Sequence, residues 1–162
     1  MKIYLSARII KRAASPVAFS DFLAMAADAG YDGVGLRQAQ VMPELDEAAL
    51  AKMRALLDSH GLGVCSLPLS APPAYYVQIA RRLGVKVLQT GGTPEEMSEL
   101  AAGLDADMAL GPQMHTRGDY ENVSLAAENL RRAADRRVGV IVEPANLMFT
   151  GAKWSAALFE PL

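Results

Sequence analysis

Residues 138–147 of this chain have the sequence VGVIVEPANL. The segment from Val138 to Val142 is apolar, rich in β-branched residues, too short to cross a membrane and without helical periodicity, so it predicts a strand buried on both faces, as in parallel sheets. Pro144 lacks a backbone donor and disfavours helix at the residue before it, so the strand is expected to stop at Glu143. Glu143 is therefore expected at the carboxyl-terminal edge of the sheet, where α/β proteins gather ligand-binding and catalytic groups.

Three segments nearer the N-terminus share one form. Each has the end of an amphipathic helix, a glycine, and an apolar strand a few residues later: AADAGYDGVGLR (26–37), LLDSHGLGVCSL (56–67) and IARRLGVKVLQT (79–90). Their spacing is too uneven for a solenoid repeat. Alternating helices and strands instead predict a parallel sheet with right-handed crossovers.

The rest of the chain supplies further units of this kind. Helix signals include Asp46 before a helix over 47–60, Pro72 and Pro73 at the entry of the next, and a capping box in Thr93-Pro94-Glu95-Glu96. The remaining predicted elements are strands over 2–7 and 108–110, helices over 18–29 and 120–132, and the start of a sixth helix over 154–162. A TIM barrel has eight strand–helix units in about 250 residues. The sequence thus predicts a single α/β domain over residues 1–162, parallel (β/α) and TIM-barrel-like, with about six of eight units in an incomplete or compacted barrel.

Composition limits the kinds of partner. The chain is 51% hydrophobic with 6% aromatics and a net charge of −2, which argues against nucleic acid and membrane partners and favours a small soluble ligand. The single cysteine, Cys65, lies in apolar GLGVCSL, is expected to be buried, and excludes a disulfide within one chain. Arg8, Lys11 and Arg12 interrupt any signal-peptide core at the start, so cytoplasmic residence is expected.

Polar side chains follow several predicted strands. Arg8 and Arg37 each come after a strand, so they can hold a phosphate or carboxylate at the shared edge; equally, they can be solvated or pair with Glu143. Gln113 and His115 follow the strand over 108–110 two residues apart, which places them on the same side. Imidazole exchanges protons near neutral pH, whereas the glutamine can bind a sugar hydroxyl or satisfy nearby backbone.

The motifs GPQMHT (111–116) and EPANL (143–147), with Gly151 soon after, resemble the sugar phosphate isomerase/epimerase family. The resemblance extends over nearly the whole chain and implies a xylose isomerase-like TIM barrel that lacks the last two strand–helix units. In the better-known members a divalent metal (Mn, Mg, Zn or Co) is held by acids on the fifth and sixth strands, a histidine on the seventh and a glutamate on the eighth. The resemblance therefore implies Glu143 and Gln113 as metal ligands. Gln113 is a neutral amide where the family has a glutamate.

Two hypotheses about function follow. The first is a sugar or sugar-phosphate isomerase or epimerase that acts on a small carbohydrate by proton transfer alpha to its carbonyl, with assistance from a divalent metal. Its catalytic candidates are Glu143 and His115. The residues expected to bind substrate are Arg8, Arg37, Gln113 and Asn146. The alternative is a non-catalytic shortened barrel or fragment that binds a small ligand or a partner chain. Six parallel strands leave open sheet edges, so a homodimer that covers them is expected. A DNA-repair nuclease like the family's endonuclease branch fits poorly with the acidic net charge.

Overall fold

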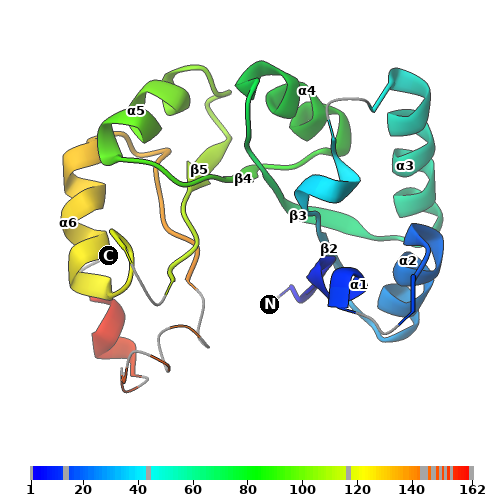
Figure 1. The fold of residues 1–162 in the computed structure, drawn as a ribbon, viewed down its shortest axis with the longest axis horizontal. Helices are drawn as coiled ribbons and strands as arrows, with labels where there is room; N and C mark the ends of the chain where they lie inside the picture. Colours follow the sequence, from blue (N-terminus) through cyan, green and yellow to red (C-terminus); the bar gives the residue numbers. More distant parts are fainter. Residues whose placement is uncertain are drawn as a thin grey trace. The chain divides into compact units, whose positions relative to one another are not determined.

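The computed structural model describes residues 2–12, 15–42, 45–115, 118–142 and 155–160, together with residues 146, 149, 151 and 153. Its five strands are β1 (Tyr4–Ser6), β2 (Gly33–Gly35), β3 (Gly63–Pro68), β4 (Val87–Gln89) and β5 (Ala109–Gly111). They form one parallel sheet in chain order, with helices between them (Figure 1). This confirms the predicted parallel α/β arrangement. The chain divides into two compact units, Met1–Leu88 and Gln89–Leu162.

The first unit has helices between and after its strands β1 to β3. These helices are α1 (Arg8–Arg12), α2 (Phe19–Asp28), the 3-10 helix η1 (Gln38–Gln40), α3 (Glu47–Ser59) and α4 (Pro73–Leu83). Helix α2 contacts β2, α4 contacts β3, and α3 contacts both α2 and α4. Phe22, Leu57 and Leu67 are fully buried in this core.

The start of the chain differs from the prediction. The strand expected over 2–7 is limited to Tyr4–Ser6, and Arg8 begins α1 instead of lying in a loop. Pairing with β2 ends where Ala7 N–H donates to Gly35 O at 2.9 Å, and the Ser6 hydroxyl then accepts from Arg8 N–H at 3.3 Å. The backbone therefore turns at Ser6 and continues as a helix.

Glycines in the three repeated segments have one shared role. Gly30, Gly61 and Gly84 have φ of 78°, 66° and 68°, each just after a helix. This left-handed conformation costs an L-residue free energy that glycine avoids, and it directs the chain from the helix back toward the sheet. The prediction that Gly30 ends its helix is confirmed.

In the second unit, helix α5 (Pro94–Ala102) contacts β5 and helix α6 (Val123–Ala133). The two helices lie side by side (Figure 1). Near the end of the described residues lies the 3-10 helix η2 (Ala156–Phe159), where the sequence predicted the start of a longer helix over 154–162. Trp154 and Leu162 lie outside the described residues. Met97, Leu110 and Met114 are buried in the core of this unit.

Helix starts in this unit follow their capping residues. Thr93 Oγ1 accepts from Glu96 N–H at 3.2 Å and Glu96 Oε2 accepts from Thr93 N–H at 2.8 Å, which confirms the predicted capping box. The helix predicted over 120–132 begins instead at Val123, because Asn122 accepts from Leu125 N–H at 2.9 Å and fixes the start there.

The predicted sixth strand pairs with β5 in parallel, but as two separate bridges, Leu110 with Val138 and Gln113 with Ile141. Val138 is buried, whereas residues 139–142 are all half-buried, so the expectation of burial on both faces is wrong beyond Val138. The reason is that no strand among the described residues pairs with its outer edge.

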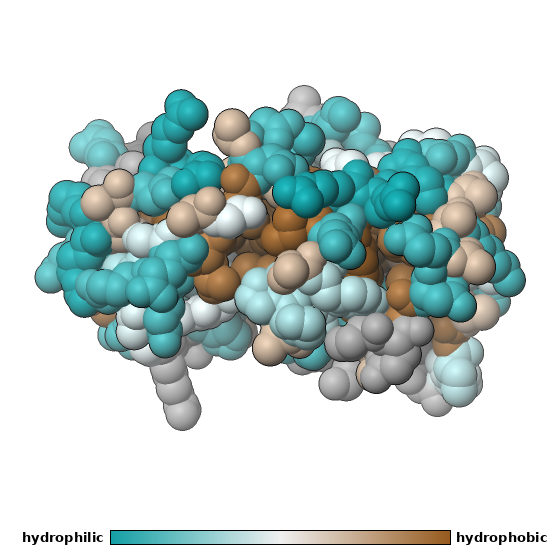
Figure 2. Space-filling model, turned by 90° about the horizontal axis from the view of Figure 1, so that it is seen from above, coloured by the Kyte–Doolittle hydropathy of each residue, from teal (hydrophilic) through white to brown (hydrophobic). Residues whose placement is uncertain are grey.

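Surface features complete the description. Hydrophilic residues cover most of the face drawn in Figure 2, and apolar residues come to the surface between them. Ile3 and Ile9, which flank β1, are 51% and 48% exposed. Cys65 is half-buried in β3 and not fully buried as expected, because its strand position faces Gly35, which has no side chain to cover it. None of the described helices is both long and apolar enough to span a membrane.

An ion pair fixes the turn that leads into the 138–141 segment. The Asp135 carboxylate accepts from Arg137 N–H at 2.9 Å and from the guanidinium at 3.1 and 2.9 Å, and Arg137 Nη1 donates to Leu104 O at 3.1 Å. These hydrogen bonds from Arg137 lower the pKa of Asp135 from 3.8 to about 2. The charged form of Asp135 therefore stabilises the folded chain.

Asp135→Asn is expected to lower the urea midpoint of unfolding at pH 7. A carboxyl whose pKa is lower in the folded than in the unfolded chain stabilises the folded chain at pH values above its unfolded-state pKa. The difference in urea midpoint between wild type and variant should therefore become smaller from about pH 4 downward and vanish near pH 2. Urea unfolding at a series of pH values measures it. Asp28→Asn is the control, because it removes a charge from an exposed position at the end of α2. Its urea midpoint should differ little from that of wild type at every pH. Parallel curves for Asp135→Asn and wild type at every pH would contradict the prediction.

Candidate functional site

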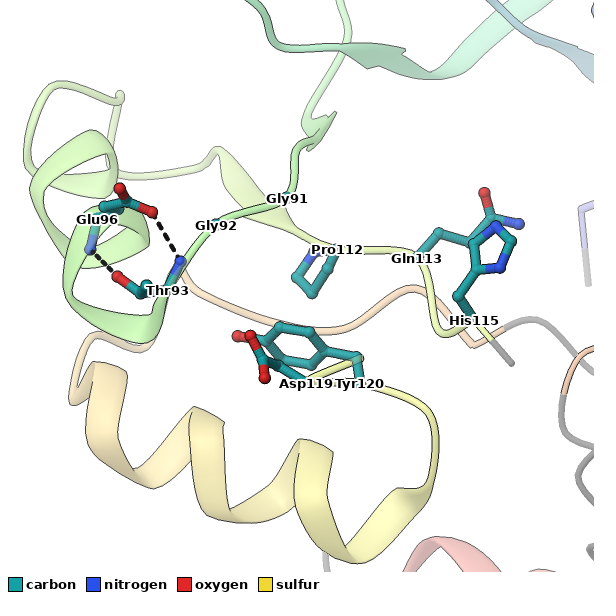
Figure 3. Close-up of a pocket in the computed structure, with 9 residues that line it drawn as sticks. All are labelled: Gly91, Gly92, Thr93, Glu96, Pro112, Gln113, His115, Asp119 and Tyr120. Carbon is teal, nitrogen blue, oxygen red and sulfur yellow. Dashed lines mark hydrogen bonds between the residues drawn. The ribbon is translucent and has the colours of Figure 1, made fainter. Parts of the chain in front are cut away.

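A pocket of about 370 Å³ lies in the second unit, where the chain leaves β4 and β5 (Figure 3). This is the carboxyl-terminal edge of the sheet, the place predicted for the site. Three segments line the pocket: the loop after β4, the segment after β5, and the loop before α6. The lining residues are Gly91, Gly92, Thr93, Glu96, Pro112, Gln113, His115, Asp119 and Tyr120.

The loop after β4 approaches α5 closely. Gly92 has φ of 141°, and a Cβ at this position would lie 2.9 Å from Glu96 Oε2. The backbone conformation strains any other residue there, and a Cβ would in addition displace the Glu96 carboxylate. Since Glu96 Oε2 already accepts from Thr93 N–H, this carboxylate holds the loop against the helix.

The segment after β5 presents its polar residues to one side. Ile141 N–H donates to Pro112 O at 2.8 Å, and Met114 N–H donates to Ile141 O at 2.9 Å. Residues 112–114 are therefore paired with Ile141 as in a parallel strand, and their side chains alternate in direction. Met114 is fully buried, whereas the residues before and after it line the pocket. Gln113 and His115 therefore share a side, as their spacing predicted, and Figure 3 shows them projecting together.

A pair of amides joins the ends of β4 and β5. Gln89, the last residue of β4, donates from Nε2 to Gln113 Oε1 at 2.7 Å. Both side chains are half-buried. The sequence did not single out Gln89. Its position at the end of a strand is the same kind of signal that identified Arg8 and Arg37 as candidates.

The loop before α6 adds two residues that the sequence did not single out. His115 N–H donates to Tyr120 O at 3.3 Å, and buried Asn129 donates from Nδ2 to Asp119 O at 2.7 Å. The Tyr120 ring is buried with its hydroxyl 3.9 Å from Met97 Sδ. Burial, and then the charge of Asp119, raise the pKa of Tyr120, so its phenol stays protonated and neutral.

The other predicted site residues lie elsewhere in the chain. Arg8 is exposed and Arg37 is half-buried, and both belong to the first unit. Asn146 donates from Nδ2 to Met114 O at 2.8 Å, so its side chain contacts the backbone between Gln113 and His115. Glu143 lies outside the described residues.

The described residues do not fit a divalent metal ion. They contain no group of three or more His, Cys, Asp or Glu side chains that can hold one. At the predicted position, Gln113 is a neutral amide whose oxygen already accepts a hydrogen bond, and hard divalent ions prefer carboxylates. The polar side chains that line the described pocket include the Gln113 amide, the His115 imidazole and the carboxylates of Asp119 and Glu96, and the last of these already accepts from Thr93 N–H.

The fold of this chain is that of the xylose isomerase-like TIM barrels. AsbF of Bacillus anthracis, titled a probable 3-DHS dehydratase, superposes with a TM-score of 0.76 at 12% identity, covering 94% of this chain and 66% of that one. A D-psicose 3-epimerase from Clostridium cellulolyticum H10 gives 0.72 at 12% identity, with 91% and 65% covered. A xylose isomerase domain protein from Alicyclobacillus acidocaldarius gives 0.69 at 16% identity, with 93% and 66% covered.

These similarities concern the fold, because the identities are low. The chain spans about two thirds of the length of the solved chains it matches. No family model and no curated protein matches the sequence. The expectation of a xylose isomerase-like TIM-barrel fold is confirmed. The solved structures with a similar fold include a probable dehydratase, a sugar epimerase and a sugar phosphate isomerase/epimerase.

Proposed function

We propose that this chain acts in the cytoplasm as an isomerase or epimerase of a small sugar or sugar phosphate. The observation that carries the proposal is the joint position of Gln113 and His115 in one pocket at the carboxyl ends of β4 and β5. The epimerases among the structures of similar fold make this chemistry the natural first test. Two of the D-psicose 3-epimerase structures were solved with D-fructose and with D-tagatose.

The chemistry needs a base and a donor to oxygen. His115 takes the proton from the carbon alpha to the carbonyl, the C–H electron pair forms a C=C bond, and the carbonyl π electrons move to oxygen. The amide of Gln113 donates to that oxygen as negative charge develops on it. Protonation of the same carbon from the other face by a second acid, for which Glu143 is the candidate, gives an epimer while His115 keeps the first proton. Return of a proton to the neighbouring carbon, with that of its hydroxyl moving away, leaves a new carbonyl and gives an isomer.

Further residues complete the proposal. Glu143 is a second base or a ligand of the substrate, and Asn146 is a contact near it. Arg8 and Arg37 belong to the first unit, so no part in this pocket is proposed for them. No step is assigned to a divalent metal, because the described donors do not fit one.

Proton exchange tests the proposal directly. Incubation with D-fructose, D-psicose and D-tagatose in D2O, followed by proton NMR, is expected to show loss of the signal at the carbon next to the carbonyl, with a new ketose or aldose appearing. A rise in ultraviolet absorbance from a conjugated carbonyl would indicate dehydration in place of isomerisation. No exchange with any of these sugars or their phosphates would contradict the proposal.

A second candidate is a non-catalytic shortened barrel that binds a partner chain, and the edge of the sheet favours it. Within the described residues β1 pairs only with β2, and Ile3 and Ile9 beside it are about half exposed. A second copy that covers this edge would remove both from water. Absence of exchange together with a solution mass of twice 17.3 kDa would support this candidate.

A further inference from the structure

We propose that Asp119 sets the charge preference of this pocket, which takes an uncharged sugar whose hydroxyl groups donate to the Asp119 carboxylate and rejects a sugar that carries a phosphate at that end. The inference deepens the proposed function and rests on it for the identity of the ligand as a sugar. Asp119 is a specificity-determining residue, because it lines the pocket away from His115, the proposed base.

The backbone of Asp119 is held on both sides. Asn129 in α6 is buried and donates from Nδ2 to Asp119 O at 2.7 Å. Glu121 N–H donates to Gly118 O at 3.2 Å, which closes a turn that contains Asp119. The carboxylate therefore leaves a fixed stretch of backbone, so a ligand that binds it has only the side chain to order.

The Asp119 carboxylate is open to a ligand. The residue is exposed, and its carboxylate makes no hydrogen bond or ion pair with the part of the chain that the structure describes. A carboxylate only accepts hydrogen bonds, and its two oxygens can accept from two neighbouring hydroxyl groups of one molecule. Hydrogen bonds to a charged acceptor are about twice as strong as those between neutral groups. A sugar, which carries hydroxyl groups on adjacent carbons, fits this acceptor.

The pocket has its proposed reactive residues and Asp119 at different ends. Figure 3 shows Gln113 and His115 projecting together on one side of Pro112, and the Asp119 carboxylate on the other side, where the Tyr120 ring also lies. Pro112 and Tyr120 are buried and line the pocket, so part of its lining is apolar and suits the C–H groups of a sugar. A sugar with its carbonyl at His115 therefore directs its distant hydroxyl groups toward Asp119.

The charge of the lining opposes an anion at this end. Asp119 and Glu96 are carboxylates, and none of the described lining residues is lysine or arginine. Arg132 in α6 is close enough to influence the pKa of Tyr120, but its guanidinium donates to Glu95 at 2.9 Å, so its charge is already paired. A phosphate group carries a charge of about −1.5 to −2, so Asp119 repels it.

A pair of compounds that differ only in a phosphate tests the inference. D-fructose and D-fructose 6-phosphate are titrated separately into the protein, and binding is followed by two-dimensional amide NMR. Wild type should bind D-fructose at least about tenfold more tightly than the phosphate, because like charges oppose the phosphate. Asp119→Asn keeps the size of the side chain and removes its charge, so the two affinities should come within about threefold of each other. Asp119→Lys reverses the charge and should make the phosphate the tighter ligand.

Glu128→Gln is the matched control. It removes one negative charge from an exposed position of α6 that does not line the pocket, so both affinities should stay within about twofold of those of wild type. Equal affinity of wild type for the two compounds, binding of neither, or an unchanged preference in Asp119→Lys would overturn the inference. Arg117, two positions before Asp119, lies outside the described residues. Tight phosphate binding by wild type that Arg117→Gln abolishes would also overturn the inference, because the preference would then belong to Arg117.

Binding and exchange give separate results. Selective binding of D-fructose without deuterium exchange would contradict the proposed function alone. Exchange with equal efficiency on D-fructose and its phosphate would contradict the role of Asp119 alone.

Discussion

Replacing His115 with asparagine is expected to slow deuterium uptake by the sugar about 10²- to 10⁴-fold, the usual loss when a general base is removed. Asparagine keeps a polar side chain of similar size at this exposed position but cannot accept the proton. The backbone bond from residue 115 N–H to Tyr120 O does not involve the side chain, so the loop should keep its place. The Michaelis constant should change much less than the turnover rate, because Gln113 still binds the ligand.

The second of the two histidines supplies the matched control. His60 ends α3, where its N–H donates to Leu57 O, in the first unit and away from the lining of the pocket. His60→Asn should leave the exchange rate within about twofold. If His115→Asn also leaves the exchange rate within about twofold, His115 is not the base. Glu143→Gln is then the variant to measure.

Local rules predicted much of the fold. Gly30 and Gly84 end their helices in the left-handed conformation, and Thr93 and Glu96 form the reciprocal cap expected from their spacing. Each of these features depends on residues within four positions of one another, which a sequence shows directly. The order of helices and strands then restricts the topology to a parallel sheet.

Rules for residues that are close in sequence could not predict the contacts that build the site. The bond between Gln89 and Gln113 joins residues 24 positions apart, and it depends on the register of two neighbouring strands. Hydrophobic patterns do not specify that register: between β2 and β3 it shifts after Val34, where Gly35 pairs with Ser66. The loop of Asp119 and Tyr120 is held by Asn129, on the following helix, and by His115 N–H, ten and five positions away in the sequence.

Close pairing of β5 with the 138–141 segment has a strict steric requirement. Gly111 ends β5, and Leu110, the residue before it, pairs with Val138. A Cβ on Gly111 would lie 2.0 Å from Gly139 O and 2.6 Å from Gly139 C. Both atoms belong to the backbone, so no side chain can move to relieve the clash. The pairing that places Gln113 beside Ile141 therefore depends on the absence of a side chain at position 111.

Gly111→Ala is accordingly expected to lower the free energy of unfolding by about 3 kcal/mol, at the upper end of the usual range for overpacked sites. Urea unfolding followed by circular dichroism measures this change. Gly139→Ala is the matched control on the facing segment: a Cβ there meets no atom within 4 Å, so the expected change is within about 0.5 kcal/mol. Equal effects of the two substitutions would show that the segment does not pair with β5 in this register. The positions of Gln113 and His115 in the pocket would then lose their structural basis.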